Sequence, residues 1–145
     1  MIKFTIPLTP ITKKNSQRIA TNYLTGKPFI MPSEQYKQYE RDAMYFIPRG
    51  KRINTPVNIK CLFYMPTRRK CDLTNLLEAI DDILVKAGLL ADDNYTVIES
   101  HDGSRVFYDK NRPRTEIYIT ASGTIKDTVY KCPVCAHTMN RFEVR

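Results

Sequence analysis

Residues 71–88 read CDLTNLLEAIDDILVKAG, and this stretch has the pattern of one amphipathic helix. Seven apolar residues recur at the spacing of a helix with about 3.6 residues per turn: Leu73, Leu76, Leu77, Ile80, Ile83, Leu84 and Ala87. Asp72 fits the N-cap, because its side-chain oxygen can accept hydrogen bonds from the free N–H groups of the first turn. Gly88 fits the C-terminal stop. We therefore predict a helix that packs one face against a core.

The opposite arc of this helix is rich in carboxylates and has no cation before its last turn. Within roughly 120° it carries Asn75, Glu78, Ala79, Asp82 and Lys86. A short apolar link then leads to Asp92 and Asp93, which can fold back towards this arc. Crowded carboxylates in a chain of net charge +8 are usually tolerated because a hard divalent cation lies between them. The pattern indicates either a metal site or a solvated helix face with an acidic turn behind it.

The same residues resemble the RusA family of Holliday-junction resolvases. The residues that carry the similarity are Asp72-Leu73-x-Asn75, Asp82, Lys86-Ala87-Gly88, Asp92-Asp93, Pro10, Lys13-Lys14-Asn15-Ser16, Met65-Pro66, Arg68-Arg69 and the closing stretch 114–119. It covers about residues 1–120, which we take as a nuclease domain. The resemblance implies a small homodimeric nuclease, often encoded by phages or prophages, that uses Mg²⁺ to nick four-way junctions in DNA recombination and repair.

The resemblance also implies the residues of the site. The expected metal ligands are Asp72, Asp82, Asp92 and Asp93. The expected catalytic set is Asp72, Asp93, Asn75 and Lys70. Asn75 would orient a ligand or contact the phosphate, and Lys70, Arg69 or Lys86 would neutralise charge in the transition state. Metal-assisted hydrolysis would then leave 5′-phosphate and 3′-hydroxyl ends.

The chain departs from the better-known members of that family at two positions. They carry a second Asp two residues after the first, where this chain has Thr74, and a Lys on the helix where it has Glu78. Glu78, one turn further along, can replace the lost carboxylate, whereas the lost Lys has no local substitute except Lys70 or Lys86. A non-catalytic protein that binds DNA junctions is therefore the alternative to a nuclease.

The positive charge is grouped, which points to a polyanionic partner. The residues expected to contact DNA are Lys13, Lys14, Arg68, Arg69 and Lys86. The group from Arg68 to Lys70 stands directly before Asp72, where a scissile phosphate would have to be held. No apolar run approaches the roughly 20 residues that span a bilayer, and no signal peptide is evident. We expect a cytoplasmic protein, with no membrane partner, whose cysteines are reduced or metal-bound.

The rest of the first 120 residues predicts an α+β fold with a mixed sheet and two main helices. Strands are expected at 2–8, 57–65, 95–101, 104–109 and 115–120, a hairpin at 19–24 and 28–31, and a helix from the Ser33 cap to about residue 46. A turn at 102–103 should join two of the strands. Tyr36, Tyr39, Ala43 and Phe46 should face the core. Cys61 is expected to be a core thiol and His101 to be structural.

Residues 121–145 differ in character from the rest of the chain. Ala121-Ser122-Gly123 has the composition of a linker. Cys132 and Cys135 form a Cys-x-x-Cys turn, which is a common half of a Zn²⁺ site, and His137 or the tail of a second copy would have to complete it. The tail is then either an appendix that binds no metal or a zinc-stabilised module that recruits a partner protein.

Overall fold

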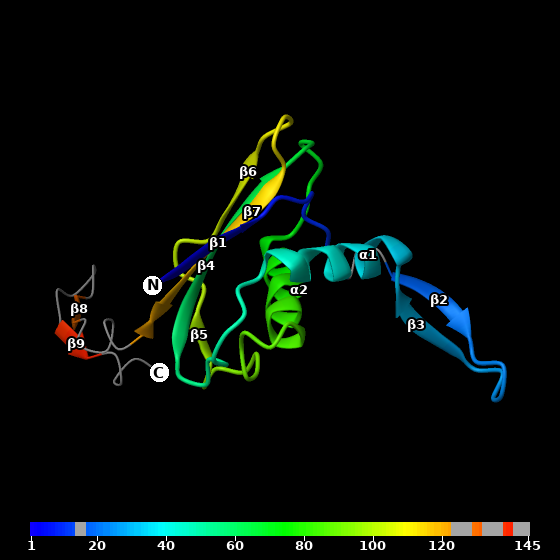
Figure 1. Ribbon diagram of the computed structural model, residues 1–145, viewed down its shortest axis with the longest axis horizontal. Helices are drawn as coiled ribbons and strands as arrows, with labels where there is room; N and C mark the ends of the chain where they lie inside the picture. Colours follow the sequence, from blue (N-terminus) through cyan, green and yellow to red (C-terminus); the bar gives the residue numbers. More distant parts are fainter. Residues whose placement is uncertain (14–16, 123–128, 132–137, 141–145) are drawn as a thin grey trace.

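The computed structural model describes residues 1–13, 17–122, 129–131 and 138–140. A five-stranded mixed sheet forms the body, and both helices pack on one of its faces (Figure 1). The elements are β1 (Ile2–Ile6), β2 (Gln17–Thr21), β3 (Pro28–Pro32), α1 (Glu34–Ala43), the 3₁₀ turn η2 (Met44–Phe46), β4 (Val57–Met65), α2 (Leu73–Lys86), β5 (Ile98–Ser100), β6 (Arg105–Tyr108), β7 (Arg114–Ala121), β8 (Val129–Lys131) and β9 (Thr138–Asn140). The predicted α+β class is confirmed.

Strand β4 is the centre of the sheet. It pairs antiparallel with β7 on one side, and β7 pairs antiparallel with β1. On its other side β4 pairs in parallel with β5 near its start and with β6 near its end. Its alternate residues Ile59, Cys61 and Phe63 are fully buried, as expected where one face of a sheet lies under helices. The predicted strand over 57–65 and the predicted core thiol are both confirmed.

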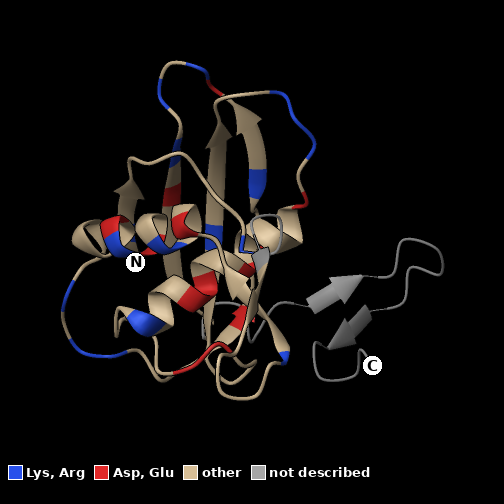
Figure 2. Cartoon of the chain, turned by 90° about the vertical axis from the view of Figure 1, so that its right-hand side faces the viewer, with Lys and Arg blue, Asp and Glu red and all other residues tan. Residues whose placement is uncertain are grey.

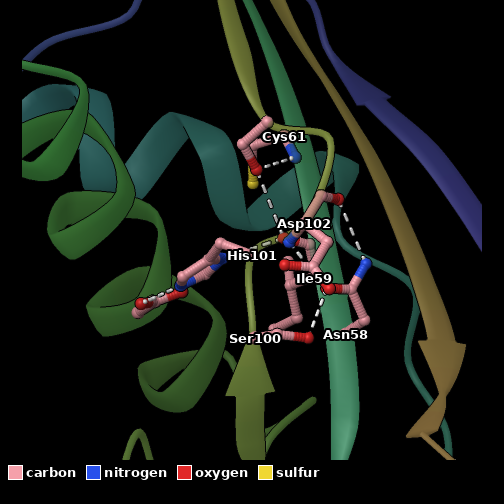
Figure 3. Close-up of polar contacts among 8 residues, drawn as sticks. Asn58, Ile59, Cys61, Ser100, His101 and Asp102 are labelled. Atoms are coloured by element: carbon pink, nitrogen blue, oxygen red, sulfur yellow. Dashed lines mark hydrogen bonds and ion pairs between the residues drawn. The ribbon is translucent and has the colours of Figure 1, made fainter. Parts of the chain in front are cut away.

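The predicted turn at 102–103 is present, but the two strands that it joins do not pair with each other. Both lie along the same edge of β4 because the Asn58 side chain holds the turn there (Figure 3). Asn58 Oδ1 accepts hydrogen bonds from Ser100 Oγ at 2.6 Å and from the Asp102 backbone N–H at 2.7 Å. Gly103 completes the turn with φ of 85°, a conformation that other residues rarely adopt.

Helix α1 begins where predicted. Ser33 is its N-cap, and its hydroxyl accepts a hydrogen bond from the Tyr36 backbone N–H at 3.1 Å. Tyr36 and Tyr39 are buried in the core, as expected. The prediction for Phe46 is wrong, since this side chain is 41% exposed. The helix gives way to a 3₁₀ turn after Ala43, and the tighter turn moves Phe46 off the buried stripe.

Helix α2 matches the predicted helix, and Gly88 follows it with φ of 81°. Its buried residues are Leu76, Ala79, Ile80, Ile83 and Leu84. Asp72 occupies the N-cap, but its side chain makes no capping hydrogen bond and instead accepts one from Asn75 Nδ2 at 3.3 Å. Ala79, expected on the polar arc, is buried. The polar residues of α2 therefore do not form one continuous arc on the helix surface.

Two parts of the sequence prediction fall outside this description. Lys14 and the residues of the proposed half-site, Cys132 and Cys135, lie outside the described residues, so the zinc tail stays a prediction. Among the described helices, none combines the length and the apolar character that crossing a bilayer requires.

Replacing Asn58 with Ala should lower the free energy of unfolding by about 1–3 kcal/mol, because it removes the hydrogen bonds by which the buried Asn58 side chain holds the 100–102 turn. Chemical denaturation of both proteins measures this difference. The exposed Asn111 provides a matched control, and Asn111→Ala should be nearly neutral. Equal unfolding midpoints for the Asn58 variant and the parent would show that Asn58 does not hold the turn.

Candidate active site

The polar side of α2 forms two stripes that face different neighbours. Asp82 faces the segment between β1 and β2, and Lys86 faces α1. Asp82 Oδ2 lies 3.7 Å from Lys13 Nζ, and Lys86 Nζ donates to both carboxylate oxygens of Glu40 at 3.0 Å. Each member of this stripe is thus paired with a group of opposite charge.

The second stripe lines a cleft of about 240 Å³, which we call the α2 cleft. Its lining residues are Thr74, Leu77, Glu78 and Asp81 of α2, Asp93 of the following loop, and His101 of the turn after β5. Thr74 and Glu78 are the two positions at which the sequence departs from the better-known RusA pattern. Both departures therefore lie in the same cleft as Asp93, and they change its charge directly.

His101 connects α2 to the central strand. Its Nδ1 lies 2.8 Å from the Ile59 carbonyl oxygen and its Nε2 lies 2.9 Å from Asp81 Oδ2 (Figure 3). A carbonyl oxygen only accepts, so Nδ1 carries a hydrogen. A close contact between Nε2 and Oδ2 then requires a second hydrogen between them, on the imidazole or on the carboxyl. The pair retains a proton at the edge of the cleft.

The pKa shifts of the pair follow from this geometry. Burial acts to lower the pKa of His101, but the hydrogen bond and the charge of Asp81 outweigh it and raise that pKa above its ordinary value. Burial raises the pKa of the Asp81 carboxyl, and His101 opposes this shift only in part. The Asp81 side chain is 15% exposed, and its Oδ1 is buried with no hydrogen-bond partner among the described residues. A buried carboxylate oxygen without a hydrogen-bond partner is costly, which agrees with the raised pKa of Asp81.

The two acidic residues after α2 have different surroundings. Asp92 accepts hydrogen bonds from the Asp93 backbone N–H at 2.7 Å and from Asn94 Nδ2 at 3.0 Å, and these bonds lower its pKa. The side-chain hydrogen bond with Asp92 raises the pKa of Asp93, and the charge of Asp82 adds to the increase. Asp93 is thus the member of the pair that lines the cleft and feels the carboxylates of α2.

The carboxylates expected from the resemblance do not all converge. Asp72 and Asp82 are ten residues apart, which is roughly 15 Å along a helix, so the two cannot ligate the same ion. Within the described part of the chain, no three His, Cys, Asp or Glu side chains are arranged closely enough to hold a metal ion. Among the described residues, Glu78, Asp81 and Asp93 share the α2 cleft, and carboxylate oxygens are the donors that Mg²⁺ prefers.

The basic residues before α2 are placed at the end of β4. Arg69 and Lys70 are exposed, and the Arg68 guanidinium lies 4.3 Å from the centre of the Tyr108 ring. Figure 2 shows basic loops beyond the end of the sheet, with acidic positions on the helices and on the loop after α2. Cations and carboxylates therefore occupy neighbouring regions, as binding and cutting a polyanion requires.

Residues 7–120 match the model of the family described as endodeoxyribonuclease RusA. The chain belongs to the RusA endodeoxyribonuclease family. It is also similar to the crossover junction endodeoxyribonuclease RusA of Aquifex aeolicus (strain VF5), with 29% identity over 58 residues. That alignment covers 40% of this chain and 45% of the relative, so the chain spans less than half of the relative's length in it. The RusA resemblance seen in the sequence is confirmed.

Sequence reasoning within this RusA domain missed Asp81, and it expected His101 to be structural without identifying its partner. The spacing of Thr74, Glu78 and Asp81, at i, i+4 and i+7, was a usable signal, because it places the three on one helix face. An arc counted from Asp72 instead favours Asn75 and Asp82. For His101 the sequence offers no such signal, since its partner Asp81 is 20 residues away along the chain.

His101 should make stability depend on pH. A group whose pKa rises on folding stabilises the folded state fully below its unfolded pKa, here about 6.5, and loses that contribution as the pH rises through the folded pKa. We compare the parent with His101→Gln, whose amide can still donate to the Ile59 carbonyl but does not titrate. Urea denaturation in EDTA measures the free energy of unfolding of both proteins. The amount by which the parent exceeds the variant should be larger at pH 6 than at pH 9. A gap that is the same at both pH values would contradict the ion pair.

Proposed function

We propose that this protein is a Mg²⁺-dependent, structure-selective endonuclease that resolves Holliday junctions and other branched DNA in recombination and repair. Membership of the RusA family supports the reaction class. The observation that carries the proposal is the α2 cleft, which the carboxylate residues Glu78, Asp81 and Asp93 line together. A basic chain that builds such a cleft beside exposed cations is suited to hold a polyanion at a metal-binding carboxylate.

The ion is best accommodated by the carboxylates of the cleft. We propose Asp93 as the central ligand; Glu78 and Asp81 line the same cleft, and their carboxylates would have to shift towards Asp93 before they could share an ion with it. Asp82 and Asp92 add negative charge beside them, while Asp72 contributes from the N-terminal end of α2. When bound, Mg²⁺ supplies positive charge at the scissile phosphate and lowers the pKa of a water molecule.

The surrounding side chains have separate tasks in this proposal. Arg68, Arg69 and Lys70 hold the phosphate backbone at the start of α2, where Asn75 is within reach of the same phosphate group. Lys13 screens Asp82 from the DNA backbone through its ion pair. A C₂ homodimer would present two equivalent clefts, which matches the two symmetric cuts that a four-way junction needs.

Asp93→Asn should abolish cleavage of a labelled four-way junction in Mg²⁺ while keeping junction binding. The substitution removes a charge that holds the ion, and it also reduces repulsion of the DNA phosphates. Asp42→Asn on α1 is the matched control, because its carboxylate bonds to Gln38 and does not line the cleft, and it should cleave normally. Cleavage by the Asp93 variant at the parent rate would remove Asp93 from the ligand set.

Substitutions of Glu78 test whether this side chain compensates for the carboxylate that is lost at Thr74. If Glu78 supplies the oxygen that Thr74 cannot, Glu78→Gln should raise the Mg²⁺ concentration for half-maximal cleavage, as measured by titration. Glu78→Lys should then cleave less well than Glu78→Gln, because it puts a cation beside the ion. Identical titration curves for parent and variants would show that Glu78 only faces water. A parent that binds junctions but cuts none in Mg²⁺ would favour the non-catalytic alternative.

A further inference from the structure

Strands β2 and β3 form a two-stranded ribbon, residues 17–32, that projects from the body (Figure 1). In the described part of the chain each pairs only with the other. Ile19 lies opposite Ile30 on one face, and Ala20 lies opposite Phe29 on the other. Ile19, Ile30 and Phe29 are all exposed. An isolated two-stranded hairpin is marginally stable in water, so a ribbon that is apolar on both faces calls for a partner.

The tip of the ribbon is held in one conformation. The Asn22 backbone N–H donates to the Lys27 carbonyl at 3.0 Å, and the Gly26 N–H donates to the Asn22 carbonyl at 2.8 Å. The Leu24 N–H donates to Asn22 Oδ1 at 2.9 Å, and Gly26 takes a positive φ of 69°. This turn presents Tyr23 fully exposed and Leu24 96% exposed. Two large side chains, Tyr23 and Leu24, are thus exposed to water at the tip of a hydrogen-bonded turn.

Charge identifies the class of partner. Residues 1–33 contain five Lys or Arg residues and not one Asp or Glu. Two copies of such a segment repel each other, whereas DNA attracts it through its phosphates. Lys13, four residues before the ribbon in the sequence, contacts Asp82 on the stripe of α2 outside the cleft. The five-residue strands of the ribbon extend roughly 17 Å, so its tip can contact DNA away from the body of the protein.

We propose that Tyr23 and Leu24 form a wedge that inserts at the branch point of a DNA junction. This inference rests on the proposed function and adds the feature that tells a junction from a linear duplex. Base pairs inside a duplex are stacked on both sides, whereas a branch point leaves base faces that a side chain can cover. Apolar side chains enter DNA at such unstacked steps, and aromatic rings stack on the exposed bases. Phosphate contacts alone would bind both forms of DNA.

The test compares binding to a four-way junction and to a linear duplex of the same sequence, in EDTA so that no strand is cut. Full-length Tyr23→Ala and Leu24→Ala should each lose about tenfold in junction affinity and keep duplex affinity within about twofold. Tyr23→Phe, which keeps the ring, should retain junction affinity. Tyr45→Ala is the matched control, because Tyr45 is exposed on η2, outside the ribbon. A 2-aminopurine at the branch point should change its fluorescence with the parent and not with Tyr23→Ala.

Three results would overturn the wedge. One is an equal loss of affinity for junction and duplex, or no loss for either. Another is a smaller species in sedimentation velocity for Tyr23→Ala and Leu24→Ala, which would make the ribbon a contact between copies of the chain. The third is a parent protein that binds junctions no better than duplexes. A parent that prefers junctions but cuts none with any divalent metal would defeat the nuclease proposal and leave the wedge in place.

Discussion

The contact of His101 with both β4 and α2 is the constraint on which the candidate site depends. One ring nitrogen bonds to the Ile59 carbonyl of the central strand and the other meets the Asp81 carboxyl of the helix. Asn58 holds the turn that carries His101 against the same strand. Helix, strand and turn are thereby fixed relative to one another, and the α2 cleft is lined by α2, by the loop that carries Asp93 and by His101 of the turn. Its geometry is a property of three elements together.

The charge distribution around α2 shows how a basic protein tolerates this density of carboxylates. On the stripe facing α1, Lys13 accompanies Asp82 and Lys86 pairs with Glu40. On the cleft stripe the compensation is of another kind, since the Asp81–His101 pair retains a proton and leaves one Asp81 oxygen without a partner among the described residues. The two stripes of α2 therefore differ in how their charge is compensated, by ammonium groups on the stripe of Asp82 and Lys86 and by His101 at Asp81.

The family match and the cleft together define what is particular to this chain. RusA membership rests on residues 7–120 as a whole, whereas the two departures from the family pattern, Thr74 and Glu78, lie in the cleft itself. A family pattern conveys a fold and a reaction class, but the ligands of an ion depend on which side chains share a cavity. In this chain Glu78 and Asp81 line the same cleft as Asp93, so the cleft is formed partly by residues that the pattern does not include.

The sequence by itself determined the local elements and the family. The strand over 57–65 and the helix from Leu73 to Lys86 follow from patterns contained in each segment, and the RusA resemblance follows from spacings along one stretch. Tertiary structure decided the rest. The β5–β6 turn docks on β4 instead of closing a hairpin, and a 3₁₀ turn leaves Phe46 exposed. Packing between distant segments decided which polar stripe of α2 faces α1, and it brought His101 to Asp81. Helical periodicity alone could not predict either contact, because it carries no information about the neighbours of a helix.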